Sequence, residues 1–253
     1  MVFWQYVLIG IGAFLAGGVN ALAGGGTLIT FPLLTFVGIP AVVANITNTV
    51  ALCPGYFGAT LAQWKEIRNQ KNRLWLYFPA AVLGGVAGGY LLLQSGEKLF
   101  RGLVPYLILL ASLLLALGDP VRNWLNRKNP SVQLKLGLEI ASILAVLAAA
   151  VYGGYFGAGL SVIFLAVLGI FINDSLPRLN ALKQILALAT NIAAAVFFIF
   201  SGKVNWGVAA LMAVFALAGG ALGGKLAGKI SAKVLRWLVV GIGLAVSIYY
   251  FFQ

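Results

Sequence analysis

Long runs of apolar residues follow one another along this chain, with short polar stretches between them. A helix of about twenty apolar residues spans the hydrocarbon core of a bilayer. Two shorter apolar pieces, 27–38 and 160–172, each follow a glycine-rich break. The longer runs cover residues 3–23, 41–62, 74–93, 103–117, 136–151, 179–200, 204–226 and 238–252. This pattern predicts an all-α polytopic membrane protein with no soluble domain.

The order of these features repeats along the chain. A G-x-G pattern at 24–26 returns at 157–159, and a GG-x-x-GG pattern at 84–89 returns at 219–224. Either pair alone could arise by chance, but both pairs in the same order and at nearly the same offset indicate an internal repeat. We predict two repeats of about five helices each. Their boundaries are 1–118 and 136–253, with a cytoplasmic linker at 119–135.

The distribution of Lys and Arg predicts the topology, because these residues accumulate in cytoplasmic loops. If both short pieces cross the membrane, the chain has ten crossings, and 14 Lys and Arg lie on one side against 3 on the other. If the short pieces re-enter instead, eight crossings divide them 9 to 8. We therefore predict ten crossings and two inverted halves. Both termini are expected outside.

Composition supports a membrane protein and excludes several functions. Hydrophobic residues make up 62% of the chain and charged residues 9%, with a mean hydropathy of +1.01. Soluble domains carry about 25% charged residues. The net charge of +12 lies in loops, so we expect no nucleic-acid partner. One Cys and no His leave haem, zinc and other metals without their usual ligands, and we expect no cofactor.

The glycine breaks are the candidate functional site. Backbone polar groups must be satisfied at membrane depth, so such a break is tolerated only where protein covers it or where it lines a wet cavity. Short helices that begin after the two breaks would direct free N–H groups and positive dipole ends toward the cavity, which favours a small anion. The alternative is that these glycines only allow close helix packing, and we prefer that interpretation for the GG-x-x-GG patterns.

Polar residues near the breaks complete the predicted site. Asn and Gln side chains could instead form only interhelical hydrogen bonds. Lys183 would supply the counter-charge, unless its side chain extends to the cytoplasmic face. The predicted substrate-binding residues are Gly25, Gly26, Thr27, Asn45, Asn48, Gly159, Ser161, Lys183, Gln184 and Asn191.

Several short motifs resemble a known family. Residues 24–29 read G-G-G-T-L-I and 38–40 read G-I-P, and a weaker echo includes S-G-K-V-N-W at 201–206. With P-L-L at 32–34 and A-N-x-T at 44–47, the chain resembles the TauE/SafE (TSUP) sulfite and organosulfonate exporters over nearly its whole length. The second half departs from the pattern, since Ala158 interrupts the glycine triplet.

The resemblance implies a permease of a prokaryotic inner membrane for small anions such as sulfite, thiosulfate, a sulfonate or a small carboxylate. Such a secondary transporter would work by alternating access in the lipid bilayer. A membrane assembly or scaffold subunit is the alternative. An enzyme is not expected, because an intramembrane nucleophile would need a nearby base and the chain has no His.

Overall fold

The described parts of the chain fold into an all-α bundle. The computed structural model describes residues 2–22, 25–127, 136–225 and 232–252. The helices, in order, are α1 (Phe3–Leu22), α2 (Thr27–Phe36), α3 (Ala41–Ala62), α4 (Trp64–Arg68), α5 (Lys71–Ala116), α6 (Gly118–Arg127), α7 (Leu136–Tyr155), α8 (Leu160–Phe171), α9 (Leu176–Phe200), α10 (Trp206–Lys225) and α11 (Ala232–Phe251). Five of the described helices, α1, α5, α7, α9 and α11, are long and apolar enough to cross a membrane, which confirms an all-α polytopic fold.

One of the polar stretches between the predicted spans, residues 97–101, is helical in the structure. The polar residues 97–101 were expected to connect two spans, but α5 continues through them after a break at Gly96, whose φ of 65° and ψ of 174° are not helical. A positive φ is readily adopted by glycine alone. The following Glu97 accepts hydrogen bonds from the N–H groups of Ala41 and Val42, and thereby caps the N-terminus of α3.

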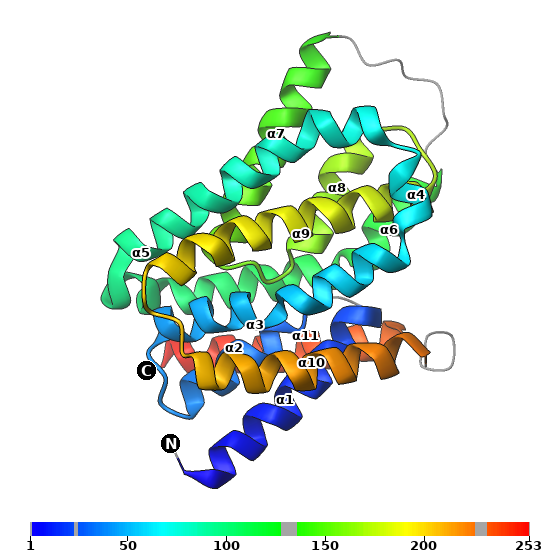
Figure 1. Ribbon diagram of the computed structural model, residues 1–253. Coiled ribbons are helices and arrows are strands. Elements are labelled where there is room, and N and C mark those ends of the chain that lie inside the picture. Colours follow the sequence, from blue (N-terminus) through cyan, green and yellow to red (C-terminus); the bar gives the residue numbers. More distant parts are fainter. Residues whose placement is uncertain (1, 23–24, 128–135, 226–231, 253) are drawn as a thin grey trace.

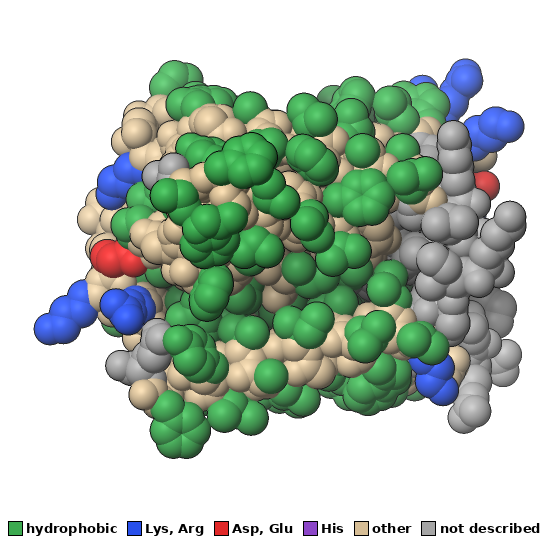
Figure 2. Space-filling model, turned by 90° about the horizontal axis from the view of Figure 1, so that it is seen from below, with side chains coloured by type: hydrophobic (Ala, Val, Ile, Leu, Met, Phe, Trp, Pro, Cys, Tyr) green, Lys and Arg blue, Asp and Glu red, His purple; other side chains and the backbone are tan. Residues whose placement is uncertain are grey.

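The bundle has two distinct ends. Both termini lie at one end, together with the break in α5, and α4 and α6 lie at the other end (Figure 1). Hydrophobic side chains cover the middle of the face in Figure 2, while Lys and Arg gather at its two ends. We call these ends the terminal end and the α4 end. This distribution is the one expected of a protein whose helices cross a bilayer.

Helices of the two halves interlock through glycines. α10 packs along α1, and α5 packs along α7. A methyl group added to Gly219 would overlap the carbonyl oxygen of Phe14, and one added to Gly84 would stand 2.7 Å from the carbonyl oxygen of Leu147. The GG-x-x-GG patterns thus bring helix backbones into direct contact, as small residues do between membrane helices.

The helix boundaries themselves repeat. α1 begins at Phe3 and α7 begins at Leu136, and the starts of α2 and α8 are separated by the same number of positions. The starts of α3 and α9 are slightly further apart, because α8 has 12 residues and α2 has 10. α3 and α9 also pack against each other at the centre of the bundle.

An ion-pair cluster ties the loops of the α4 end together. Asp174 accepts hydrogen bonds from Arg73 and from its neighbour's N–H, and it pairs with Arg178 at 3.2 Å. Gln70 Nε2 donates to the carbonyl oxygen of Arg178 at 3.0 Å. The loop before α5 and the loop before α9 therefore lie at the same end of the bundle.

The glycine contact predicts a specific destabilisation. Gly219→Ala should lower the thermal unfolding midpoint in detergent by several degrees, because the new Cβ overlaps the Phe14 carbonyl and α10 must move away from α1. Gly220→Ala is the matched control, since the nearest atom to its Cβ would be 3.7 Å away. The control should be neutral or slightly stabilising, as alanine favours a helix by about 1 kcal/mol over glycine. Equal midpoints for both variants would contradict the close contact.

A second prediction concerns pH. Burial raises the pKa of the Asp174 carboxyl, but the hydrogen bonds from Arg73 and the Ser175 N–H and the charges of Arg73 and Arg178 outweigh it and hold the pKa below its ordinary value of 3.8. A lowered folded-state pKa stabilises the fold above the unfolded-state pKa, and this contribution is lost as the pH falls through the folded-state value.

Asp174→Asn should therefore lower the unfolding midpoint at neutral pH by roughly 2–4 °C, which corresponds to about 1 kcal/mol for a partly exposed ion pair. The difference from the wild type should shrink as the pH falls below about 4. Glu66→Gln, at an exposed residue of α4, is the control and should show no such trend. A difference that stays constant down to about pH 3 would rule out the ion pair as its source.

Candidate functional site

The first glycine break connects α1 to α2 near the centre of the bundle. Gly25 has a φ of 92°, and Gly26 donates its N–H to Asn20 Oδ1 at 2.8 Å. A methyl group on Gly26 would stand 2.6 Å from the carbonyl oxygen of Ala16. The Asn20 side chain therefore satisfies one backbone donor that the break exposes, as membrane depth requires.

The second break has the same form between α7 and α8. Gly157 and Gly159 have φ values of 79° and 75°, which favour glycine at both positions. Tyr152 on α7 donates its hydroxyl to the carbonyl oxygen of Ala158 at 2.7 Å. Backbone groups of this break are thus also bonded within the protein.

The two breaks share one small cavity. Its volume is about 10 Å³, and it is lined by Gly25 and Thr27 from the first break and by Gly159 and Ser161 from the second. Such a volume holds about one water molecule. Asn20, Tyr56, Leu115, Gly157, Ala158, Leu160 and Val162 complete its lining. Residues from the two halves of the sequence are therefore neighbours here.

Both short helices begin at this cavity and run to opposite ends. α2 leads to Val37, whose carbonyl oxygen accepts a hydrogen bond from Gln5 at the terminal end. α8 leads to the loop of Asp174, which binds Arg73 at the α4 end. Two positive helix ends therefore point to the centre of the bundle, an arrangement that attracts negative charge.

Two asparagines of α3 contact the surroundings of the two breaks, Asn48 at the first and Asn45 at the second. Asn48 is buried, and it accepts a hydrogen bond from Thr30 at 2.5 Å and lies 3.4 Å from Thr27 Oγ1. Asn45 donates Nδ2 to the carbonyl oxygen of Tyr155 at 2.9 Å. Both asparagines were predicted as donors to a substrate, and in this conformation each already uses its amide nitrogen within the protein.

The predicted residues of α9 lie outside the cavity lining. Lys183 is half-buried, and its Nζ donates to Asn180 Oδ1 at 3.1 Å. It precedes Thr190 by seven residues, about 10 Å along the helix axis toward the α4 end. Thr190 lies beside the second break, since its Cγ2 is 3.0 Å from where a Cβ on Gly153 would stand. The Lys183 backbone is thus displaced from the cavity toward the α4 end.

The other two α9 residues are buried along the same helix. Gln184 is 9% exposed and Asn191 is 6% exposed. Asn191 donates Nδ2 to the carbonyl oxygen of Ala187 at 2.8 Å, so that it bonds within its own helix. Neither residue is among those that line the cavity.

Sequence reasoning missed two residues with polar side chains that line the cavity. Asn20 lies at the last turn of α1, and its role as an acceptor for Gly26 follows from its position six residues before a glycine break. Tyr56 lies on α3 two turns after Asn48, on the same face of the helix. A tyrosine in an apolar run carries no sequence signal of this kind, whereas an asparagine beside a break does.

Known proteins resemble the chain over nearly its whole length. A family model described as sulfite exporter TauE/SafE matches residues 9–250. A probable membrane transporter protein of Haemophilus influenzae is 27% identical over 90% of this chain and 87% of its own length. The probable membrane transporter protein ORF9 of Sinorhizobium sp is 25% identical over 94% and 89% of the two chains. The probable membrane transporter protein YfcA of Escherichia coli K12 is 25% identical over 93% and 85%. No solved structure matches the chain significantly.

Proposed function

Because the chain belongs to the TauE/SafE family of sulfite exporters, we propose that it is a secondary transporter that carries a small oxyanion by alternating access. Sulfite or a sulfonate is the first candidate, and thiosulfate and small carboxylates share the same chemistry. The observation that carries the proposal is the meeting of the α2 and α8 N-termini at one cavity. Their dipoles and the hydroxyls of Thr27 and Ser161 offer donors to anionic oxygens.

The volume of the cavity indicates an occluded conformation. A space of about 10 Å³ admits about one water molecule, so an oxyanion can enter only if the two breaks move apart. Three glycines with positive φ belong to the two breaks, Gly25, Gly157 and Gly159, and they lie where such a movement would be centred. Inverted repeats would provide two equivalent movements, one toward each side of the membrane.

The opposite directions of α2 and α8 support inverted halves of five crossings each. In this arrangement the Lys- and Arg-rich α4 end faces the cytoplasm of a prokaryotic cell, and both termini lie outside. A scaffold subunit, the alternative, has no need of a buried polar cluster at its centre. Asn48, Thr30 and Asn45 form such a cluster, and burying them costs free energy that a purely structural core avoids.

The proposal predicts a loss of transport when the cavity hydroxyls are removed. Thr27→Val and Ser161→Ala should each reduce sulfite flux into proteoliposomes by roughly tenfold, as expected for the loss of one hydrogen bond to an anion. Thr60→Val is the control, because the Thr60 hydroxyl donates to Tyr56 within α3 and lies outside the cavity lining. A scaffold protein would show no flux above empty liposomes for any of the four proteins.

A second prediction tests whether Lys183 contacts the transported anion or only extends to the cytoplasmic face. If its ammonium meets the anion as the cavity opens toward the α4 end, Lys183→Ala should abolish flux and Lys183→Arg should restore part of it, because arginine keeps the charge. Lys71→Ala, at an exposed residue of the first turn of α5, is the control. Flux and unfolding midpoint should be measured for each variant. Unchanged flux in a stably folded Lys183→Ala protein would exclude Lys183 from the transport path.

A further inference from the structure

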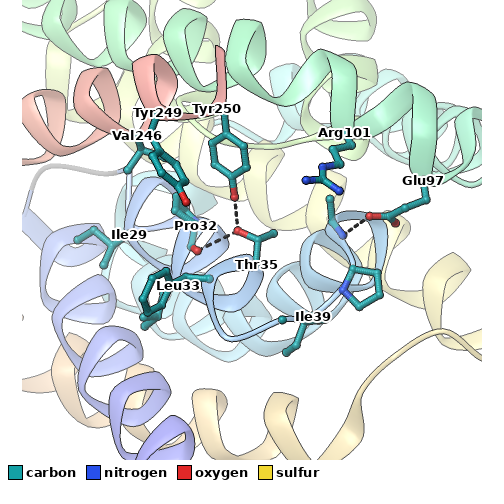
Figure 3. Close-up of a pocket in the computed structure, with 14 residues that line it drawn as sticks. Ile29, Pro32, Leu33, Thr35, Ile39, Glu97, Arg101, Val246, Tyr249 and Tyr250 are labelled. Carbon is teal, nitrogen blue, oxygen red and sulfur yellow. Dashed lines mark hydrogen bonds between the residues drawn. The ribbon is translucent and has the colours of Figure 1, made fainter. Parts of the chain in front are cut away.

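A groove opens at the terminal end of the bundle, between α2, α11 and the break in α5 (Figure 3). Its volume is about 880 Å³, and an adjoining hollow of about 650 Å³ shares Glu97, Arg101 and Tyr250 with it. We call these two connected spaces the terminal groove. Its walls are mostly apolar, and Arg101 brings a positive charge to them.

The charge of Arg101 is available to a ligand. Glu97 lies one helical turn before Arg101, but its carboxylate binds the N–H groups of Ala41 and Val42 at the start of α3. Arg101 is exposed and forms no ion pair with any residue that the structure describes. The groove therefore contains a guanidinium group whose natural partner is an anion with two or three oxygens.

The repeat gives Arg101 a counterpart at the other end of the bundle. Arg101 is the fifth residue of the part of α5 that follows Gly96, and Arg236 is the fifth residue of α11. The offset between them is the one that also separates the starts of α3 and α9. Arg101 lies beside the end of α11 at Tyr250. Arg236 lies beside the end of α5, with its guanidinium carbon 3.3 Å from where a Cβ on Gly118 would stand. The two arginines thus occupy equivalent places at opposite ends.

Their surroundings differ in this conformation. Arg101 is exposed in the terminal groove, whereas Arg236 is only 7% exposed. The hollow described at the α4 end is lined by residues 68–73 and Arg178, with no contribution from α8 or α11. Among the described residues, the terminal end is therefore open around its arginine and the α4 end is closed around the equivalent one.

We propose that the terminal groove is an anion-binding entrance to the transport path, with Arg101 as its anion contact, and that Arg236 is the equivalent contact of the entrance at the α4 end. This inference rests on the proposed function and adds residues that the central cavity does not contain. The first turn of α2 borders both spaces, because Ile29 lines the groove and Thr27 lines the cavity. An anion held at Arg101 would reach the cavity once that turn moves.

Arg101→Gln tests the groove directly. Initial sulfite uptake should be measured in membrane vesicles of both orientations, so that each end of the protein is presented to the substrate in turn. With the terminal end facing the substrate, the variant should show a KM raised by roughly three- to tenfold and an unchanged maximal rate, since one nearby charge is lost. The effect should fade at high salt, and Arg101→Lys should restore much of the affinity.

Lys203→Gln is the matched control, because it removes an exposed positive charge after α9 without changing a residue that lines the groove. The control should leave the KM unchanged. A KM for Arg101→Gln that equals the wild-type value in both orientations would overturn the entrance while leaving the transporter intact. No uptake of any tested anion by the wild-type protein would overturn both proposals.

A lipid phosphate has the same chemistry as a free oxyanion and could occupy the groove instead. Purified protein should therefore be compared in liposomes of neutral phosphatidylcholine alone and in liposomes that also contain anionic phosphatidylglycerol. An entrance for substrate predicts the same KM change for Arg101→Gln in both. A change that appears only with the anionic lipid would identify a lipid site and overturn the proposal.

Thiol labelling tests whether Arg101 and Arg236 mark equivalent entrances, and it replaces neither arginine. In a Cys53→Ser background, Gly102→Cys places a thiol beside Arg101 and Gly118→Cys places one beside Arg236. An anionic, membrane-impermeant thiol reagent should label position 102 faster than position 118 in this conformation. An added sulfonate, which unlike sulfite does not consume the thiol reagent, should change the two rates in opposite directions. Rates that change together, or not at all, would contradict alternating entrances.

Discussion

The fold depends on one constraint, that backbone N–H and carbonyl groups must find partners where no water is available. Two glycine breaks at membrane depth expose such groups, and the chain satisfies them from within. Asn20 accepts the Gly26 N–H, and Tyr152 donates to the Ala158 carbonyl. Both breaks are therefore enclosed by other helices. The same enclosure places two helix N-termini at one point, so the requirement that stabilises the fold also creates a place for negative charge.

The sequence allowed much of the fold to be predicted, because glycine and hydrophobicity report directly on backbone requirements. The starts of α2 and α8 were expected from the G-x-G breaks, at Thr27 and Leu160. The helical character of residues 97–101 was not expected, since several charged residues after a glycine are typical of a loop. Glu97 also caps α3, which is a tertiary contact between residues far apart in the sequence and has no local signal.

The candidate site was predictable to a similar degree and for similar reasons. Gly25, Thr27, Gly159 and Ser161 line one cavity, and they were identifiable because they flank the breaks. The depth of Lys183 relative to the cavity was not predictable, because the sequence gives the place of a residue along its own helix but not how that helix is positioned against its neighbours. Tyr56 was missed because a tyrosine fits an apolar span as well as it fits a cavity wall.

Helices of the first half pack on helices of the second half, and this arrangement has a consequence for biosynthesis. α1 packs on α10, whose first residue, Trp206, is made about two hundred residues after α1 begins. At about 5–20 residues per second, α1 emerges from the ribosome roughly 10–40 s before its partner. During that interval lipid must cover the glycine face of α1. A chain truncated before α10 would leave that face permanently without its partner.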